Sequence, residues 1–186
     1  LATSETVTAL ALDAKQENLY AGTASGAVLR FDLRAGDVAA AETAQAGTAS
    51  VTSLALLIGG RTLVVGLADG SLSTWFAVPH SDAAPRLTRV RDYPAYPGAV
   101  LQVAPSQRDR SFLVSSADGT LGLQHSTSGR TLWRGASPLG ATTALSFAPK
   151  GDGAAIASDG RLASLAVANP HPELSLGTLF GKVWYE

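Results

Sequence analysis

The polar residues that could do chemistry in this chain are few and widely separated. The three histidines are His80, His125 and His171, and no two of them lie at the short spacing that zinc ligands share. The chain contains no cysteine, so thiolate nucleophiles, disulfides and cysteine-based metal sites are excluded. The simplest interpretation is that the three histidines lie in surface loops. The sequence therefore predicts no metal site.

The aspartates form a set of a different kind. Asp69, Asp118 and Asp159 each stand directly before a glycine, and an Asp-Gly pair is typical of a tight turn in which the carboxylate accepts a hydrogen bond from its own backbone. The chain has neither the G-x-S-x-G motif of serine hydrolases nor a phosphate-binding or dinucleotide-binding glycine motif. We therefore expect no catalytic residue, no bound cofactor and no enzymatic activity.

The composition indicates a protein held together by packing. Hydrophobic residues make up 46% of the chain and charged residues only 16%, with a net charge of −1, whereas an ordinary soluble domain carries about 25% charged residues. This balance gives no electrostatic reason to expect nucleic acid or anionic lipid as a partner. No apolar run is long enough for a membrane helix, and no signal peptide is evident. The absence of methionine suggests a domain excised from a longer protein.

One pattern of strands and turns occurs four times along the chain. Leu12, Leu56, Val103 and Phe147 are the second inward residues of four short alternating strands, and a turn glycine follows each after 13 to 16 residues, at Gly26, Gly70, Gly119 and Gly160. Alternation of apolar and polar residues is typical of a strand with one buried side. A repeat of about 40–45 residues with several strands in each unit is typical of β-propeller blades. We expect the four inward residues to be buried.

The repeat predicts an all-β fold of about four blades, which is a partial or half propeller. The blades span about 7–43, 51–91, 99–134 and 142–168, and residues 169–186 form a tail or linker. We expect an outer strand in the first three units but not in the fourth. Trp75 and Trp133 should fill the wedges between neighbouring sheets. Because an open array exposes apolar blade faces, a second copy or another chain should cover them.

Two stretches of the fourth unit resemble WD-repeat blades. They are TALSFAPKGDG from Thr143 and SDGRLASL from Ser158, and in the first unit Phe31 and Asp32 stand where the family has its Trp-Asp pair. The resemblance covers roughly residues 7–168. No unit has the family's Gly-His pair, so the buried polar network of typical repeats cannot form. The resemblance implies the architecture and no specific partner.

The tail carries a second resemblance. Residues Asn169 to Glu186 (NPHPELSLGTLFGKVWYE) resemble the segment that leads into the second membrane helix of bacterial phosphate ABC-transporter permeases, some of which carry a WD-like insert there. This resemblance implies a non-catalytic accessory domain on the periplasmic side of the inner membrane, in contact with the rest of the permease or with its substrate-binding protein. The alternative is a stand-alone, cytoplasmic propeller scaffold for protein–protein interaction.

Four residues are candidate contacts for a partner or for the membrane surface. Trp184 and Tyr185 follow the repeats and would lie near the membrane interface if the permease resemblance holds, because amphipathic rings are favoured there; a frayed terminus is the alternative. Arg108 and Arg110 flank Asp109 at the expected tip of a hairpin. The simplest interpretation of that tip is a solvated turn, and the functional one is a contact with a protein partner.

Overall fold

The computed structural model describes residues 4–34, 42–80, 83–149, 151–168 and 180–184, and these residues form four antiparallel sheets of four strands each. Within every sheet the strands pair in chain order: the first strand pairs with the second, the second with the third and the third with the fourth. The described residues contain no helix that is long and apolar enough to cross a membrane. The all-β fold class is confirmed.

The strands follow the predicted repeat closely. The first sheet contains β1 (Val7–Leu12), β2 (Asn18–Thr23), β3 (Ala27–Asp32) and β4 (Glu42–Gln45). The second contains β5 (Val51–Leu56), β6 (Thr62–Leu67), β7 (Leu72–His80) and β8 (Ala83–Tyr93). The third contains β9 (Val100–Pro105), β10 (Ser111–Ser116), β11 (Thr120–His125) and β12 (Arg130–Ala136). The fourth contains β13 (Ala144–Phe147), β14 (Gly153–Ser158), β15 (Arg161–Ala168) and β16 (Phe180–Trp184).

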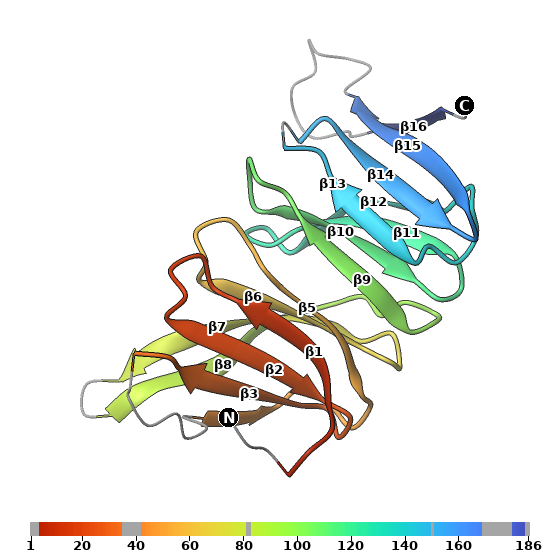
Figure 1. The fold of residues 1–186 in the computed structure, drawn as a ribbon. Helices are drawn as coiled ribbons and strands as arrows, with labels where there is room; N and C mark the ends of the chain where they lie inside the picture. The colour runs from red at the N-terminus through yellow and green to blue at the C-terminus, as the bar shows by residue number, and fades with distance from the viewer. Residues whose placement is uncertain (1–3, 35–41, 81–82, 150, 169–179, 185–186) are drawn as a thin grey trace.

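The four sheets follow one another like the blades of a propeller that stops partway round. The opening strands β1, β5, β9 and β13 contact one another in that order. Figure 1 shows the first and fourth sheets at opposite ends of the array, with the N-terminus beside the first and the C-terminus beside the fourth. The described strands therefore form a partial propeller rather than a closed four-bladed ring.

The turns have the geometry that the sequence predicts. All four turn glycines adopt positive φ, from 74° at Gly160 to 87° at Gly119, which is the conformation that glycine adopts without steric cost. The Asp69 carboxylate accepts a hydrogen bond of 2.9 Å from the Ser71 backbone N–H, and Asp118 accepts one of 3.2 Å from the backbone N–H of Thr120. The aspartates are therefore turn residues, as predicted.

Three apolar clusters hold adjacent blades together. Trp75 is 5% exposed and lies in the cluster between the first two blades, as expected, and Trp133 is partly buried against the cluster between the last two. Phe112, which is fully buried, lies in the middle cluster and meets Tyr93 edge-to-face, with ring centroids 5.5 Å apart. Each blade is thus stabilised mainly by its neighbours.

Two expectations about burial and one about the strands are wrong. Val103 and Phe147 are buried as predicted, but Leu12 is 50% exposed and Leu56 only partly buried. Leu12 lies on the side of β1 that faces away from the second blade, and no described blade precedes it. The expectation that the fourth unit lacks an outer strand is also wrong, since β16 pairs with β15. The part of the tail at residues 169–179 and 185–186 lies outside the described residues.

Candidate functional site: the faces of the end blades

The described residues show no arrangement of side chains suited to catalysis. No group of three or more His, Asp or Glu residues could hold a metal ion among them. The His125 ring nitrogen Nδ1 lies 3.0 Å from the Ser128 hydroxyl in an ordinary turn. Side chains of His80 and His171 lie outside the described residues. The polar groups that sequence reasoning weighed for chemistry are thus dispersed over different blades.

Three of the four residues proposed as partner or membrane contacts lie within the described residues. Arg108 and Arg110 lie on the connection between β9 and β10, where both are exposed. Trp184 ends β16, the outer strand of the fourth blade, and Tyr185 lies outside the described residues. Arg108 and Arg110 therefore lie on a different blade from Trp184. Their role in binding stays a prediction.

The most exposed apolar surface of the first blade is the side that faces away from the second. Leu10 and Leu12 are 62% and 50% exposed. Across the strands β1, β2 and β3, Leu10 pairs with Ala21, which pairs with Leu29. In the same way Leu12 pairs with Leu19, which pairs with Phe31. Directly paired residues share one side of a sheet. We call this set the leading face; it comprises Leu10, Leu12, Leu19, Ala21, Leu29 and Phe31. Ala21, Leu29 and Phe31 are buried in a cluster of the first blade, so the exposed part of this face lies on β1.

The fourth blade ends the array with a face of small side chains. Ala144 is paired through Ala157 to Leu162, and Ser146 is paired through Ala155 to Ser164. Leu162 is 74% exposed, and Ala144, Ser146, Ala155 and Ser164 are also exposed. We call this set the trailing face; it comprises Ala144, Ser146, Ala155, Ala157, Leu162 and Ser164. None of these six residues is charged, and their side chains are mostly smaller than those of the leading face.

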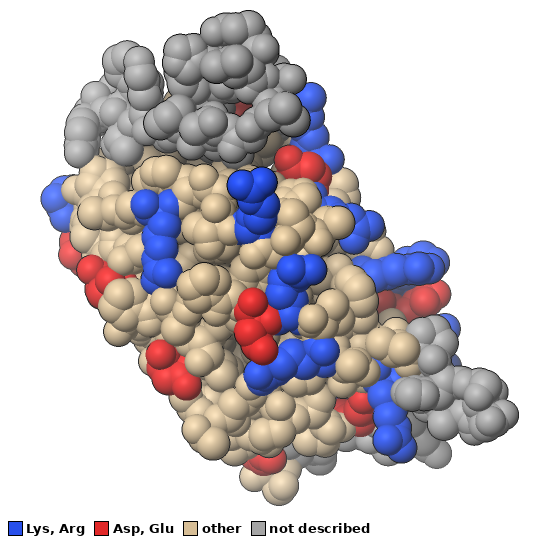
Figure 2. Space-filling model, turned by 180° about the vertical axis from the view of Figure 1, so that it is seen from behind, with Lys and Arg blue, Asp and Glu red and all other residues tan. Residues whose placement is uncertain are grey.

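Arginines on the outer strands are engaged within the protein. Figure 2 shows basic side chains spread over the face turned away from the view of Figure 1, with acidic side chains between some of them. Arg89 lies over the Trp75 ring, 5.0 Å from its centroid, and Arg134 lies 4.2 Å over Tyr96. Arg91 donates hydrogen bonds of 3.3 Å to two backbone carbonyls of the third blade, at Thr127 and Ser128. Arg91 therefore links the second and third blades, whereas Arg89 packs on a tryptophan of its own blade.

A surface recess of about 440 Å³ lies between the first two blades, beside these arginines. It is lined by Asp69, Ser71, Arg89, Asp92 and Tyr93 among others. Arg89 donates a hydrogen bond to the Ala46 carbonyl and forms an ion pair of 3.1 Å with Asp92. Its charge is therefore already balanced within the protein, and the recess gives no basis for naming a ligand.

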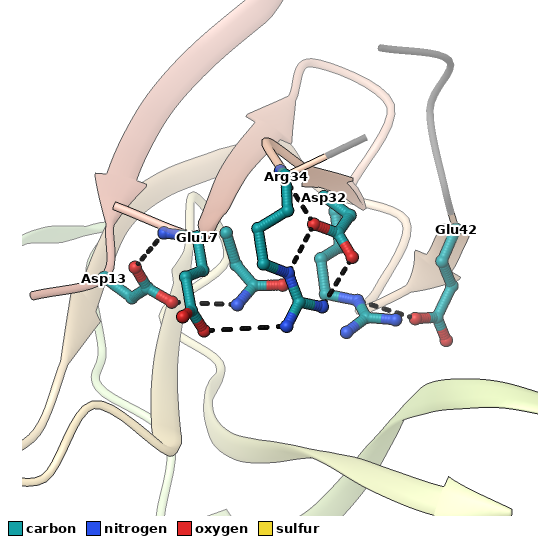
Figure 3. Close-up of polar contacts among 7 residues, drawn as sticks. Asp13, Glu17, Asp32, Arg34 and Glu42 are labelled. Carbon is teal, nitrogen blue, oxygen red and sulfur yellow. Dashed lines mark hydrogen bonds and ion pairs between the residues drawn. The ribbon is translucent and has the colours of Figure 1, made fainter. Parts of the chain in front are cut away.

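A cluster of charged residues at the edge of the first blade is internally paired (Figure 3). The Arg34 guanidinium donates to both carboxylate oxygens of Asp32, at 2.9 and 2.6 Å. These hydrogen bonds hold the pKa of Asp32 well below its usual value and raise the pKa of Arg34. Arg30 forms an ion pair of 3.2 Å with Glu42. The cluster stabilises the blade edge and resembles no catalytic site.

A buried polar network stands in the third blade. Gln124 is fully buried. Its Nε2 donates to the Tyr96 hydroxyl at 3.0 Å, and its Oε1 accepts from the Thr131 hydroxyl at 2.9 Å. The sequence signal was present, because Gln124 occupies the repeat position of Phe31 and Trp75. The network joins β11 and β12 to the segment that enters the blade, so its role is structural.

Comparison with known proteins identifies the fold. No protein-family model matches the chain, and no curated protein matches it. Solved structures do match. Sqt1 from Chaetomium thermophilum is 18% identical with a TM-score of 0.77, and the match covers 92% of this chain and 46% of that chain. The RRP9 WD40 repeats are 12% identical with a TM-score of 0.75, covering 100% of this chain and 52% of that chain, and the Cps50 (Swd1) β-propeller domain of Myceliophteria thermophila is 20% identical with a TM-score of 0.69, covering 83% and 48%.

These similarities establish a β-propeller of the WD40 type, as the sequence repeat predicts. At 20% identity or less they show the fold alone. The chain spans about half the length of the propeller chains that it matches. The resemblance of the tail to phosphate permeases has no support from these comparisons.

Proposed function

We propose that this chain is a non-catalytic domain for protein–protein interaction. The observation that carries the proposal is the leading face, on which Leu10 and Leu12 are 62% and 50% exposed on a blade strand. Leu10 and Leu12 are alternate residues of β1 and so form an exposed apolar strip along that strand, whereas Ala21, Leu29 and Phe31 of the same face are buried. An exposed apolar strip of this kind is a candidate contact for another protein. In the other three blades the matching side of the sheet packs against a neighbouring blade. A protein partner on the first blade would complete the same kind of contact.

The proposal is tested by site-specific crosslinking in cells that express the native protein. A photoreactive phenylalanine analogue at Leu12 should give covalent adducts with protein upon irradiation. The same analogue at Val90, which is 47% exposed on the outer strand β8, is the matched control and should give few. Equal labelling at both positions, or no adduct at Leu12, would contradict the proposed function.

The resemblance of residues 169–186 to phosphate permeases favours a second candidate function. Under this proposal the domain is an accessory part of a permease on the periplasmic side of the inner membrane, and it contacts the substrate-binding protein or regulates uptake. Deleting residues 7–168 from the parent protein should then leave membrane insertion intact and change phosphate uptake under phosphate limitation. Unchanged uptake and unchanged partner binding would reject this candidate and favour the cytoplasmic scaffold.

A further inference from the structure

The second and third blades each have two ends, and the chain topology assigns every connection to one of them. In an antiparallel sheet the connection between the first and second strands lies at the same end as the connection between the third and fourth. The connection between the second and third strands lies at the opposite end. The opening strands β5 and β9 contact each other, and Figure 1 shows the β5–β6 and β9–β10 connections on the same side of the array. The corresponding ends of the two blades therefore lie side by side.

One of these ends carries an excess of arginine. The β5–β6 and β9–β10 connections and the starts of the outer strands β8 and β12 contribute exposed arginines. The one described carboxylate in these segments belongs to Asp109, and it accepts a hydrogen bond of 2.8 Å from the Ser111 backbone N–H. We call this set of arginines the basic end; it comprises Arg61, Arg86, Arg108, Arg110 and Arg130.

Hydrogen bonds between the connections bring the positive charges together. The Ser126 backbone N–H donates to the Arg110 carbonyl at 3.0 Å, so the β9–β10 connection lies beside the β11–β12 turn that precedes Arg130. Arg91 of β8 donates to two carbonyls of the same turn at 3.3 Å. Because these acceptors are uncharged, they leave the charge of Arg91 unbalanced as well. The second blade thus adds positive charge to the turn of the third.

The opposite end of the same two blades has the reverse balance. Its described charged residues are three aspartates and two arginines, namely Asp69, Asp92, Asp118, Arg89 and Arg134. Arg89 is paired with Asp92. At the basic end, by contrast, four arginines form no ion pair with a described carboxylate, namely Arg61, Arg86, Arg110 and Arg130. The positive charge is therefore confined to one end of the two blades and is available to a partner.

The chemistry of the basic end indicates the kind of partner. A guanidinium group presents forked N–H donors that match the oxygens of a carboxylate or a phosphate. Proteins that bind single-stranded nucleic acid add aromatic rings on which bases stack. None of the described aromatic side chains is exposed, and the whole chain has a net charge of −1. These features favour carboxylates over nucleic-acid phosphates.

We propose that the basic end binds an acidic segment of a partner protein. The inference rests on the proposed function, because it names the chemistry of a protein partner. It places the contact on the second and third blades, whereas the exposed strip of Leu10 and Leu12 lies on the first. Several exposed arginines acting together would attract the segment and orient it, and this attraction should weaken as salt screens the charges.

Fluorescence anisotropy of a labelled glutamate-rich peptide with the purified chain tests the proposal. The peptide should bind at low salt and dissociate as the salt concentration rises. Arg61→Glu and Arg110→Glu should each weaken binding about fivefold, since both side chains are exposed and each contributes one charge pair. Arg161→Glu is the matched control, because Arg161 is exposed at the opposite end of the fourth blade, and it should leave the affinity unchanged. No binding at low salt, or an equal loss in all three variants, would overturn the proposal.

A variant that strengthens binding separates a charge effect from damage to the fold. Asp109→Asn removes the negative charge among the arginines and keeps a side-chain oxygen for the Ser111 N–H, so the peptide should bind more tightly. Unchanged or weaker binding would contradict the proposal. A single-stranded oligonucleotide of equal charge should bind more weakly than the peptide, and tighter binding would identify a nucleic-acid site instead. A peptide that fails to bind, together with protein adducts at Leu12, would overturn this inference and leave the proposed function standing.

Discussion

Close packing between neighbouring blades makes a glycine of the second strand indispensable. Gly66 on β6 lies against Val100, the first residue of β9, and a Cβ atom at Gly66 would come nearer to Cβ and Cγ1 of Val100 than carbon atoms can approach. Val100 is completely buried, so it cannot move aside. Overpacking of this kind costs about 1–3 kcal/mol. We therefore expect Gly66→Ala to lower the free energy of unfolding by that amount.

The cause is tested with a double-mutant cycle. Val100→Ala removes two buried methyl groups at about 0.8 kcal/mol each and should cost roughly 2 kcal/mol. Because the smaller side chain leaves room for the new Cβ, the double variant Gly66→Ala/Val100→Ala should be more stable than the sum of the single effects implies, by about 1 kcal/mol or more. Urea unfolding followed by tryptophan fluorescence, to which the buried Trp75 contributes, measures all three variants. Additive costs would refute the close approach of the second and third blades at this point.

Three further predictions concern the core, the polar network and the charged edge. Phe147→Ala should cost about 3–5 kcal/mol in thermal or urea unfolding, since Phe147 is 8% exposed between the last two blades; a cost below that of an exposed residue would contradict the packing. Gln124→Leu keeps the volume but leaves the buried Tyr96 hydroxyl without its donor, so it should cost about 1–3 kcal/mol, and a neutral effect would show that the network does not stabilise the blade. Because the pKa of Asp32 is lowered in the folded protein, its pairing with Arg34 stabilises the fold at pH values above the ordinary Asp pKa of 3.8, and this contribution is lost as the pH falls further. Arg34→Ala should therefore reduce the loss of stability that unfolding titrations show at acid pH. An unchanged loss would show that the pair is not its cause.

The sequence predicted the elements that depend on local chemistry. The turns are predictable at Gly26, Gly70, Gly119 and Gly160 because positive φ favours glycine, and at Asp69 because its carboxylate accepts a hydrogen bond from the backbone. These features recur in each unit, and the repeat itself fixed the order of the strands. Local patterns of this kind do not depend on what lies on the other side of the sheet.

Features that depend on a neighbouring blade could not be predicted in the same way. Strand alternation shows that Leu12 lies on an apolar side of β1, but it does not show whether another blade covers that side. The sequence does not predict β16, because Pro170 and Pro172 are unfavourable in a strand and the pairing with β15 involves only residues from Phe180 onward. The contacts of Arg134 with Tyr96 and of Arg91 with the carbonyls of Thr127 and Ser128 join residues that no motif relates.

The central claim is that the four blades form an open array whose first and last faces do not meet within one copy. Spin labels at Lys15→Cys and Asp152→Cys, on the exposed first turns of the first and fourth blades, report this directly, because the native chain has no cysteine. Lys15→Cys with Arg61→Cys labels neighbouring blades and is the reference pair. With labelled chains diluted in unlabelled protein, the distance between labels at residues 15 and 152 should clearly exceed that between labels at residues 15 and 61. Equal distances would mean a closed four-bladed ring and would contradict the account.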